Sequence, residues 1–99
     1  MATQTQSSIE YTKLKAPNKY NVIMMNDNVT PMDLVIQLLV VIFNKSATEA
    51  KDITLLIHEK GRGIAGTYSY EIAEQKCTET ISTARQSGYP LEVIIEETE

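Results

Sequence analysis

Apolar residues along the chain change their spacing several times, and each change predicts a new secondary-structure element. Residues 20–25 form a short β-prone run, which the turn-forming residues 26–28 close. Leucine, valine and isoleucine then recur at helical spacing through residues 34–42 and fill most of the helix circumference. We therefore expect a strand, a turn and a helix that is buried on several sides.

Capping residues predict where the first two helices begin and end. Thr30 is suited to the N-cap of the first helix, and Pro31 to its first helical position. Ser46 and Glu49 have the spacing of a capping box at the start of the second helix. Gly61 is the residue type that most often ends a helix in the left-handed conformation, so we expect the second helix to stop there.

The second half of the chain predicts a strand, a long helix and a final strand. Residues 63–68 can form a strand, and Ser69 can cap a helix over residues 70–86. Residues 91–95 follow a proline-containing turn and have the composition of a strand. The order is β-α-α-β-α-β, which predicts a single α+β domain with a three-stranded antiparallel sheet packed against three helices.

Length and composition predict one domain with a tail. The chain has 99 residues, and residues 1–17 are rich in Thr, Gln and Ser without hydrophobic periodicity. We expect a disordered N-terminal tail there and an ordered core over residues 18–99. The N-terminus lacks the apolar core of a signal peptide, and the longest apolar run, residues 38–43, is far shorter than the roughly 20 residues of a membrane span. These features predict a cytoplasmic protein without a membrane partner.

Charge and residue counts exclude several kinds of site. The net charge is −4, and the basic residues are scattered, whereas nucleic-acid binding needs basic clusters that neutralise phosphates. Cys77 is the single cysteine and His58 the single histidine. We therefore expect no intramolecular disulfide, no metal site and no cofactor. Cys77 falls on the apolar face of its helix, so we expect it in the core.

Two places in the sequence are candidates for a binding site. The loop of residues 26–32 carries amide and carboxylate oxygens beside apolar Met24, Met32 and Val35. It is either an ordinary strand-to-helix turn, which favours Asn and Asp, or the polar rim of an apolar pocket. His58 shares a helical stripe with Thr54 and Ile57, so it is either an ordinary helical residue or a pocket wall that accepts a hydrogen bond.

The same residues disfavour catalysis. Asp27 and His58 could act as an acid–base pair, but the sequence offers no nucleophile or oxyanion device beside them. Serine-nucleophile and phosphate-loop motifs are absent from the sequence. We expect a protein that is not an enzyme, and a small hydrolase that uses Asp27 and His58 stays an alternative.

Several motifs, taken in order, resemble the ClpS family. They span residues 19–96 and are Tyr20-x-Val22-x-x-x-Asn26-Asp27-x-x-Thr30-Pro31-Met32, His58-x-x-Gly61, Ile64-x-Gly66 and Pro90-Leu91. The resemblance implies a fold like that of a ribosomal stalk-protein C-terminal domain. It also implies an adaptor of the ATP-dependent Clp protease, which binds N-degrons (free N-termini that begin with Leu, Phe, Tyr or Trp) and delivers them to a AAA+ unfoldase.

The resemblance also implies roles for individual residues. Asn26, Asn28 and His58 would surround the α-amino group of the N-degron. The side-chain pocket would be lined or bordered by Met24, Asp27, Thr30, Met32, Val35, Thr54, Ile57 and Leu91. Glu71 and Lys76 match positions that contact the N-terminal domain of a ClpA- or ClpC-type unfoldase. Residues 1–17 resemble the family's delivery segment, and a monomer is implied.

Two positions depart from the family pattern. Asn28 stands where ClpS proteins usually have the second of two consecutive Asp residues, and Asn keeps an acceptor oxygen but loses the charge. Thr54 stands where many bacterial members have a pocket-lining Met. A smaller, β-branched residue at this position would reshape the pocket, so we hypothesise an altered ranking among first residues.

Two further alternatives stay open. A stalk-like interaction domain would share the fold but lack a pocket for an amino-terminus. A variant adaptor, given Asn28, would bind the unfoldase but no N-degrons.

Overall fold

The first strand of the chain is the central strand of the sheet. The computed structural model describes residues 18–98, so the expected tail at residues 1–17 lies outside the described residues. The elements follow the predicted order and are β1 (Tyr20–Met25), α1 (Met32–Val41), α2 (Ala47–Lys60), β2 (Arg62–Tyr68), α3 (Tyr70–Gln86) and β3 (Glu92–Glu97). The sheet order is β2-β1-β3, and both pairings are antiparallel, which confirms the predicted α+β fold.

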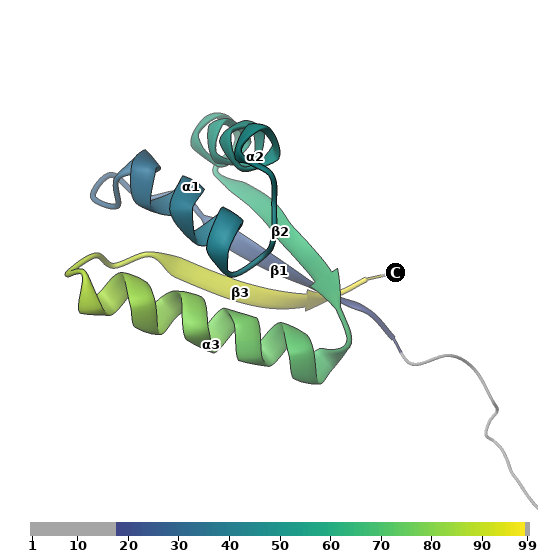
Figure 1. Cartoon of the computed structure of the whole chain (residues 1–99). Helices are drawn as coiled ribbons and strands as arrows, with labels where there is room; N and C mark the ends of the chain where they lie inside the picture. The colour runs from purple at the N-terminus through teal and green to yellow at the C-terminus, as the bar shows by residue number, and fades with distance from the viewer. Residues whose placement is uncertain (1–17, 99) are drawn as a thin grey trace, which may run out of the picture.

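All three helices pack against one face of the sheet. Side chains of β1 alternate between the two faces, and Val22 and Met24 are fully buried on the face that the helices cover. Figure 1 shows α1 and α3 running across the same side of the sheet, with α2 next to β2. Cys77 of α3 is also buried in this core, as predicted. Within residues 18–98, no helix is both long and apolar enough to cross a membrane.

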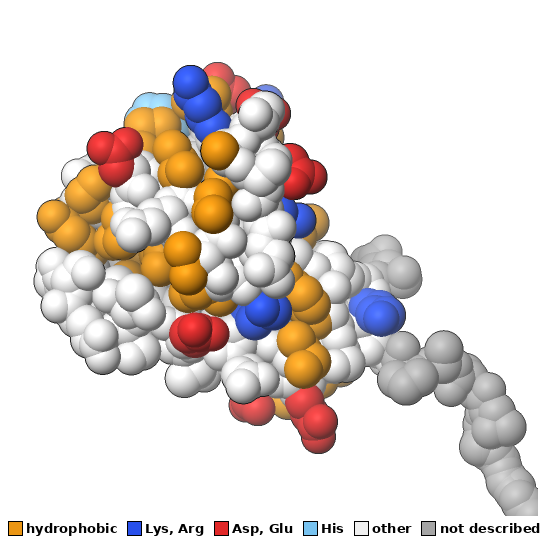
Figure 2. Space-filling model, viewed as in Figure 1, with side chains coloured by type: hydrophobic (Ala, Val, Ile, Leu, Met, Phe, Trp, Pro, Cys, Tyr) orange, Lys and Arg blue, Asp and Glu red, His pale blue; other side chains and the backbone are white. Residues whose placement is uncertain are grey.

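The other face of the sheet is only partly covered. Ile23 pairs with Ile64 on β2 and with Ile94 on β3, both of which are exposed. Arg62 of β2 and Glu96 of β3 form a 2.8 Å ion pair, which spans the central strand on this face. On the helical face, Figure 2 shows hydrophobic side chains at the surface with charged side chains lying between them.

The predicted caps are partly confirmed. Ser46 and Glu49 form the reciprocal capping box of α2, and Gly61 ends that helix with a φ of 90°. The prediction for α1 is wrong by one residue, because Pro31 is its N-cap. Thr30 lies in the turn before the helix, where its hydroxyl donates to Asp27, and no side chain makes a capping hydrogen bond at the start of α1.

The last predicted boundaries also shift slightly. Ser69 precedes α3 as expected, but its side chain makes no capping hydrogen bond. The final strand was expected at residues 91–95 and runs from Glu92 to Glu97, because its ladder with β1 begins at Glu92. The strand β2 begins at Arg62 rather than at Gly63.

Close packing between α2 and β2 gives a first test. A Cβ atom at Gly63 would lie 2.8 Å from Cγ1 of Ile57, a buried residue of α2. We expect Gly63→Ala to lower the free energy of unfolding by about 1–3 kcal/mol, because overpacking forces side chains and backbone to move. Urea unfolding of Gly63→Ala, Ile57→Ala and the double variant measures the effect, because Ile57→Ala removes the Cγ1 atom that the new methyl group would meet. The double variant should be more stable than the sum of the two losses implies, and strict additivity would contradict the packing argument.

Candidate functional site

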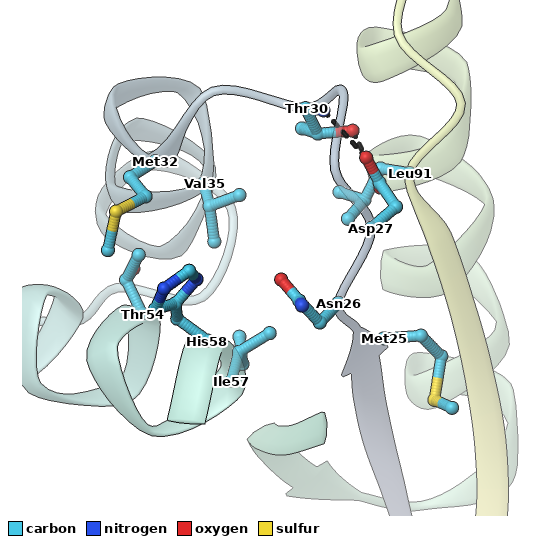
Figure 3. Close-up of a pocket in the computed structure, with 10 residues that line it drawn as sticks. All are labelled: Met25, Asn26, Asp27, Thr30, Met32, Val35, Thr54, Ile57, His58 and Leu91. Carbon is cyan, nitrogen blue, oxygen red and sulfur yellow. Dashed lines mark hydrogen bonds between the residues drawn. The ribbon is translucent and has the colours of Figure 1, made fainter. Parts of the chain in front are cut away.

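A pocket lies where β1 runs into the loop before α1. It encloses about 290 Å³ of empty space, including its open mouth. Ten residues line it, from the end of β1, the loop, α1, α2 and the approach to β3, namely Met25, Asn26, Asp27, Thr30, Met32, Val35, Thr54, Ile57, His58 and Leu91. Figure 3 shows Asp27, Thr30 and Leu91 on one side of the pocket and Met32, Val35, Thr54 and His58 on the other.

Asp27 organises the loop. Its Oδ1 accepts hydrogen bonds from the backbone N–H groups of Val29 and Thr30, at 2.7 and 2.6 Å. Its Oδ2 accepts a 2.8 Å hydrogen bond from the Thr30 hydroxyl. Burial on its own raises the pKa of Asp27, but the hydrogen bonds from Thr30 and Val29 and the positive charge of Arg85 lower it below its ordinary value. The carboxylate is therefore ionised, and its oxygens accept the hydrogen bonds that close the turn.

Asn26 and His58 are the polar groups that remain for a ligand. The backbone N–H of Asn26 donates to the carbonyl oxygen of Gly61 at 2.9 Å, which holds the start of the loop against the end of α2. In Figure 3 the side-chain amide of Asn26 extends into the space between the two sides of the pocket, and the His58 ring borders it. No hydrogen bond between the residues described in the structure engages either side chain.

The remaining wall of the pocket is apolar. Val35, Ile57 and Leu91 are buried, while Met32 is 40% exposed and lies at the edge. Thr54 is buried, and its hydroxyl donates to the carbonyl oxygen of Ala50 at 2.8 Å. Because that donor is already satisfied within α2, Thr54 offers a ligand a short and largely apolar wall.

The pocket brings together most of the residues expected there, with two exceptions. Met24 was expected to border the pocket, but it is fully buried in the core and is not among the lining residues. Its neighbour Met25 lines the pocket instead, although its side chain points away from the pocket in Figure 3. Asn28 was expected at the α-amino site, but it is exposed and outside the lining, because it lies within the turn that Asp27 closes.

The two residues expected to contact an unfoldase lie apart from the pocket, on α3. Glu71 is exposed in the first turn of that helix. Lys76 is half-buried, and its Nζ donates a 2.7 Å hydrogen bond to the carbonyl oxygen of Ile42 at the end of α1. The same ammonium lies over the rings of Phe43 and Tyr68, at 5.9 and 5.4 Å from their centroids. Lys76 thus joins α3 to α1, which the sequence did not indicate.

Arg85 was also missed. Its Nη1 donates a 2.9 Å hydrogen bond to the carbonyl oxygen of Leu91 in the pocket wall. In the sequence it is an ordinary basic residue in the last turn of a helix, which the helix dipole explains by itself. No periodicity or motif connects it with a loop elsewhere in the chain.

The geometry offers little support for hydrolysis or metal chemistry. Among the described residues, no three His, Cys, Asp or Glu side chains gather into a group that could hold a metal ion. Burial and the charge of Glu74 raise the pKa of the Cys77 thiol, which lies 3.4 Å from the carbonyl oxygen of Val93. The oxygens of Asp27 are engaged by the turn, so the carboxylate is poorly placed to act as a general base.

The fold and the pocket together define a small α+β domain that presents a half-polar, half-apolar cavity beside a strand-to-helix loop. The family model described as "ATP-dependent Clp protease adaptor protein ClpS" matches residues 15–94. The chain belongs to the ClpS family.

Relatives support this assignment over nearly the whole chain. The ClpS adapter of Helicobacter hepaticus is 44% identical over 95 residues, which cover 96% of this chain and 95% of that protein. The ClpS adapter of Deinococcus radiodurans is 42% identical over 94 residues, which cover 95% of this chain and 80% of that protein. The structure of Agrobacterium tumefaciens ClpS2 bound to L-phenylalaninamide superposes with a TM-score of 0.81 at 26% identity, covering 84% of this chain and 100% of that one.

The role of Asp27 in the loop can be tested by its pH dependence. The pKa of Asp27 is lowered in the folded protein, so its contribution to stability is present above the unfolded value and is lost as pH falls through the folded value. Between about pH 5 and pH 3, wild type should therefore lose more stability than Asp27→Ala. At neutral pH, Asp27→Ala should have the lower melting temperature.

A matched control separates this effect from a general loss of charge. Asp52→Asn removes a carboxylate from an exposed position on α2. Its melting temperature at each pH, measured by circular dichroism, should follow that of wild type. Equal acid sensitivity in wild type and Asp27→Ala would show that Asp27 does not hold the loop.

Proposed function

We propose that this protein binds the free α-amino group and the bulky hydrophobic first residue of N-degrons, with Leu, Phe, Tyr or Trp first, and delivers them to a Clp AAA+ unfoldase–protease. The observation that carries the proposal is a single pocket in which Asn26 and His58 stand beside an apolar wall. The ClpS2 relative binds L-phenylalaninamide, a ligand with a free α-amino group, an aromatic side chain and an amide in place of a peptide bond.

The polar side of the pocket suits an ammonium group. An α-amino group has a pKa near 8, so it is largely cationic at pH 7. Burying that cation requires hydrogen-bond acceptors, because an unpaired buried charge is very costly. The amide oxygen of Asn26 and a nitrogen of His58 supply acceptors within the pocket, and exposed Asn28, two residues further along the same loop, is a further candidate outside the lining. An acetylated terminus is neutral and keeps only one N–H donor.

The apolar side of the pocket suits the first side chain of the substrate. Val35, Ile57 and Leu91 are largely buried and line the cavity, with Met32 at its edge. Burying a Leu- or Phe-sized side chain against such a wall contributes roughly 1.5–3 kcal/mol. The depth and shape of the cavity, set partly by Thr54, decide which side chains fit.

We place the contact with the N-terminal domain of a ClpA- or ClpC-type unfoldase on α3, with the adaptor acting as a monomer in the cytoplasm. Exposed Glu71 is free to meet a partner. Lys76 already donates a hydrogen bond to the carbonyl oxygen of Ile42, so a substitution there would change the stability of the fold as well as any contact with a partner. Glu71 is therefore the cleaner position at which to test this contact. The protein acts by binding and not by catalysis, in keeping with the engaged oxygens of Asp27.

The decisive test is a titration with two peptides. A fluorescent peptide that begins with Phe should bind, and its N-acetylated twin should bind at least about 100-fold more weakly, because the cation and its hydrogen bonds are lost. His58→Ala should weaken binding of the free peptide, whereas Glu59→Ala, a neighbouring exposed change, should not. Equal affinity for the two peptides would refute recognition of the α-amino group, and binding of neither peptide would favour a stalk-like interaction domain.

Thr54 generates a second prediction about substrate ranking. Thr54→Met places a longer side chain on the pocket wall, at a position that is 2% exposed. We expect Trp-first peptides to lose about fivefold or more in affinity relative to Leu-first peptides, because extra volume in a packed cavity clashes with the larger ligand. Titrations with peptides that begin with Leu, Phe, Tyr, Trp, Ile and Val measure the ranking. An order that Thr54→Met leaves unchanged would rule out this role.

A further inference from the structure

Arg85 reaches the wall of the pocket from outside the cavity. It lies in the last turn of α3, and its guanidinium donates a 2.9 Å hydrogen bond to the carbonyl oxygen of Leu91. The side chain of Leu91 is almost fully buried and lines the pocket. A cation on one element therefore fixes the backbone of a residue whose side chain faces the ligand.

Leu91 needs such support because it precedes the strand. The ladder between β1 and β3 begins at Glu92, so Leu91 stands outside the regular pairing. The chain before it turns at Gly88, whose φ is 87°, and continues through Pro90, which has no N–H group to donate. The hydrogen bond from Arg85 joins the end of α3 directly to the end of this turn.

The charge of Arg85 also acts on the loop beside Leu91. It is one of the groups that favour the ionised form of Asp27, whose carboxylate closes the turn through Val29 and Thr30. Figure 3 shows Asp27 and Leu91 on the same side of the pocket. The guanidinium of Arg85 thus donates a hydrogen bond to Leu91, and its charge favours the ionised form of Asp27. Arginine suits this position, because it presents several N–H donors and a permanent charge in one planar group.

We propose that Arg85 is a positioning residue of the pocket. It holds the backbone of Leu91, and with it the wall that this side chain forms, in the position that the first residue of a substrate requires, and it does so without touching the substrate. The inference rests on the proposed function, because it concerns the same pocket.

The test compares two substitutions of Arg85 with a matched control. Arg85→Met removes the donors and the charge, and Arg85→Lys keeps the charge but loses the planar group. Arg62→Met removes the same charge from the opposite face of the sheet, where Arg62 pairs with Glu96. Fluorescence anisotropy with a Phe-first peptide measures affinity, and circular dichroism confirms that each variant is folded.

The expected order of affinities follows from the hydrogen bond. Arg85→Met should bind about 5- to 10-fold more weakly than wild type, because only part of the free energy of this intramolecular charged hydrogen bond is expected to appear in the affinity. Arg85→Lys should lie between the two. Arg62→Met should stay within about twofold of wild type, because an exposed ion pair contributes little. Should Arg85→Met fail to fold, Arg85→Lys and Arg85→Gln support the same comparison.

A second measurement, made without peptide, separates this inference from the proposed function. The ¹³C′ signal of Leu91 and the amide signals of Val29 and Thr30 should shift in Arg85→Met and stay in place in Arg62→Met. An unshifted Leu91 signal, or equal peptide affinity in the two Met variants, would overturn the role of Arg85. A wild-type protein that binds no Phe-first peptide would overturn the proposed function, and the positioning role with it.

Discussion

The pocket depends on the pairing of β1 with a strand on each side. In both ladders Met25 is the last paired residue of β1, opposite the first residue of β2 and the first residue of β3. In antiparallel pairing, the residues just before these partners, Gly61 and Leu91, come to the two sides of Asn26. Gly61 accepts the N–H of Asn26, and Leu91 forms a wall. Because α2 also ends at Gly61, the same pairing fixes His58 one turn earlier, at the edge of the cavity.

Polar groups around the pocket divide into those that shape it and those that face a ligand. The carboxylate of Asp27 uses its oxygens within the turn, but its charge remains and still attracts a cation a few ångströms away. The side chains of Asn26 and His58 border the cavity and form no hydrogen bond with the other described residues. Arg85 stands behind this arrangement as a counter-charge for Asp27 and a support for Leu91. Under the proposed function, recognition of an ammonium group combines acceptor atoms in the pocket with the nearby negative charge of Asp27.

Much of the fold and most of the pocket could be predicted from the sequence, because the signals are local. The capping box of α2, its final glycine and the alternation in β1 each depend on residues close together in the chain. The features that the sequence did not predict are the cap of α1 and the contacts of two helix cations, which depend on the three-dimensional path of the chain. Thr30 does not cap α1, because Pro31 takes the N-cap position and Thr30 belongs to the turn that Asp27 closes. Lys76 is an ordinary helix cation by sequence, and only the packing of α3 brings it to the carbonyl oxygen of Ile42. Arg85 reaches the carbonyl oxygen of Leu91, six residues further on, through the turn at Gly88, and no sequence motif predicts the path of that turn.

The assembly of the pocket from both ladders links binding to the cooperativity of folding. Its walls come from segments that meet only when β2 and β3 are both paired with β1, so a partly unfolded chain has no intact cavity. A ligand that binds the folded chain alone raises the free energy of unfolding, by about 2.7 kcal/mol at a free concentration of 100 times its dissociation constant. An occupied adaptor is therefore thermodynamically harder to unfold than an empty one, which matters for a protein that works next to an unfolding machine.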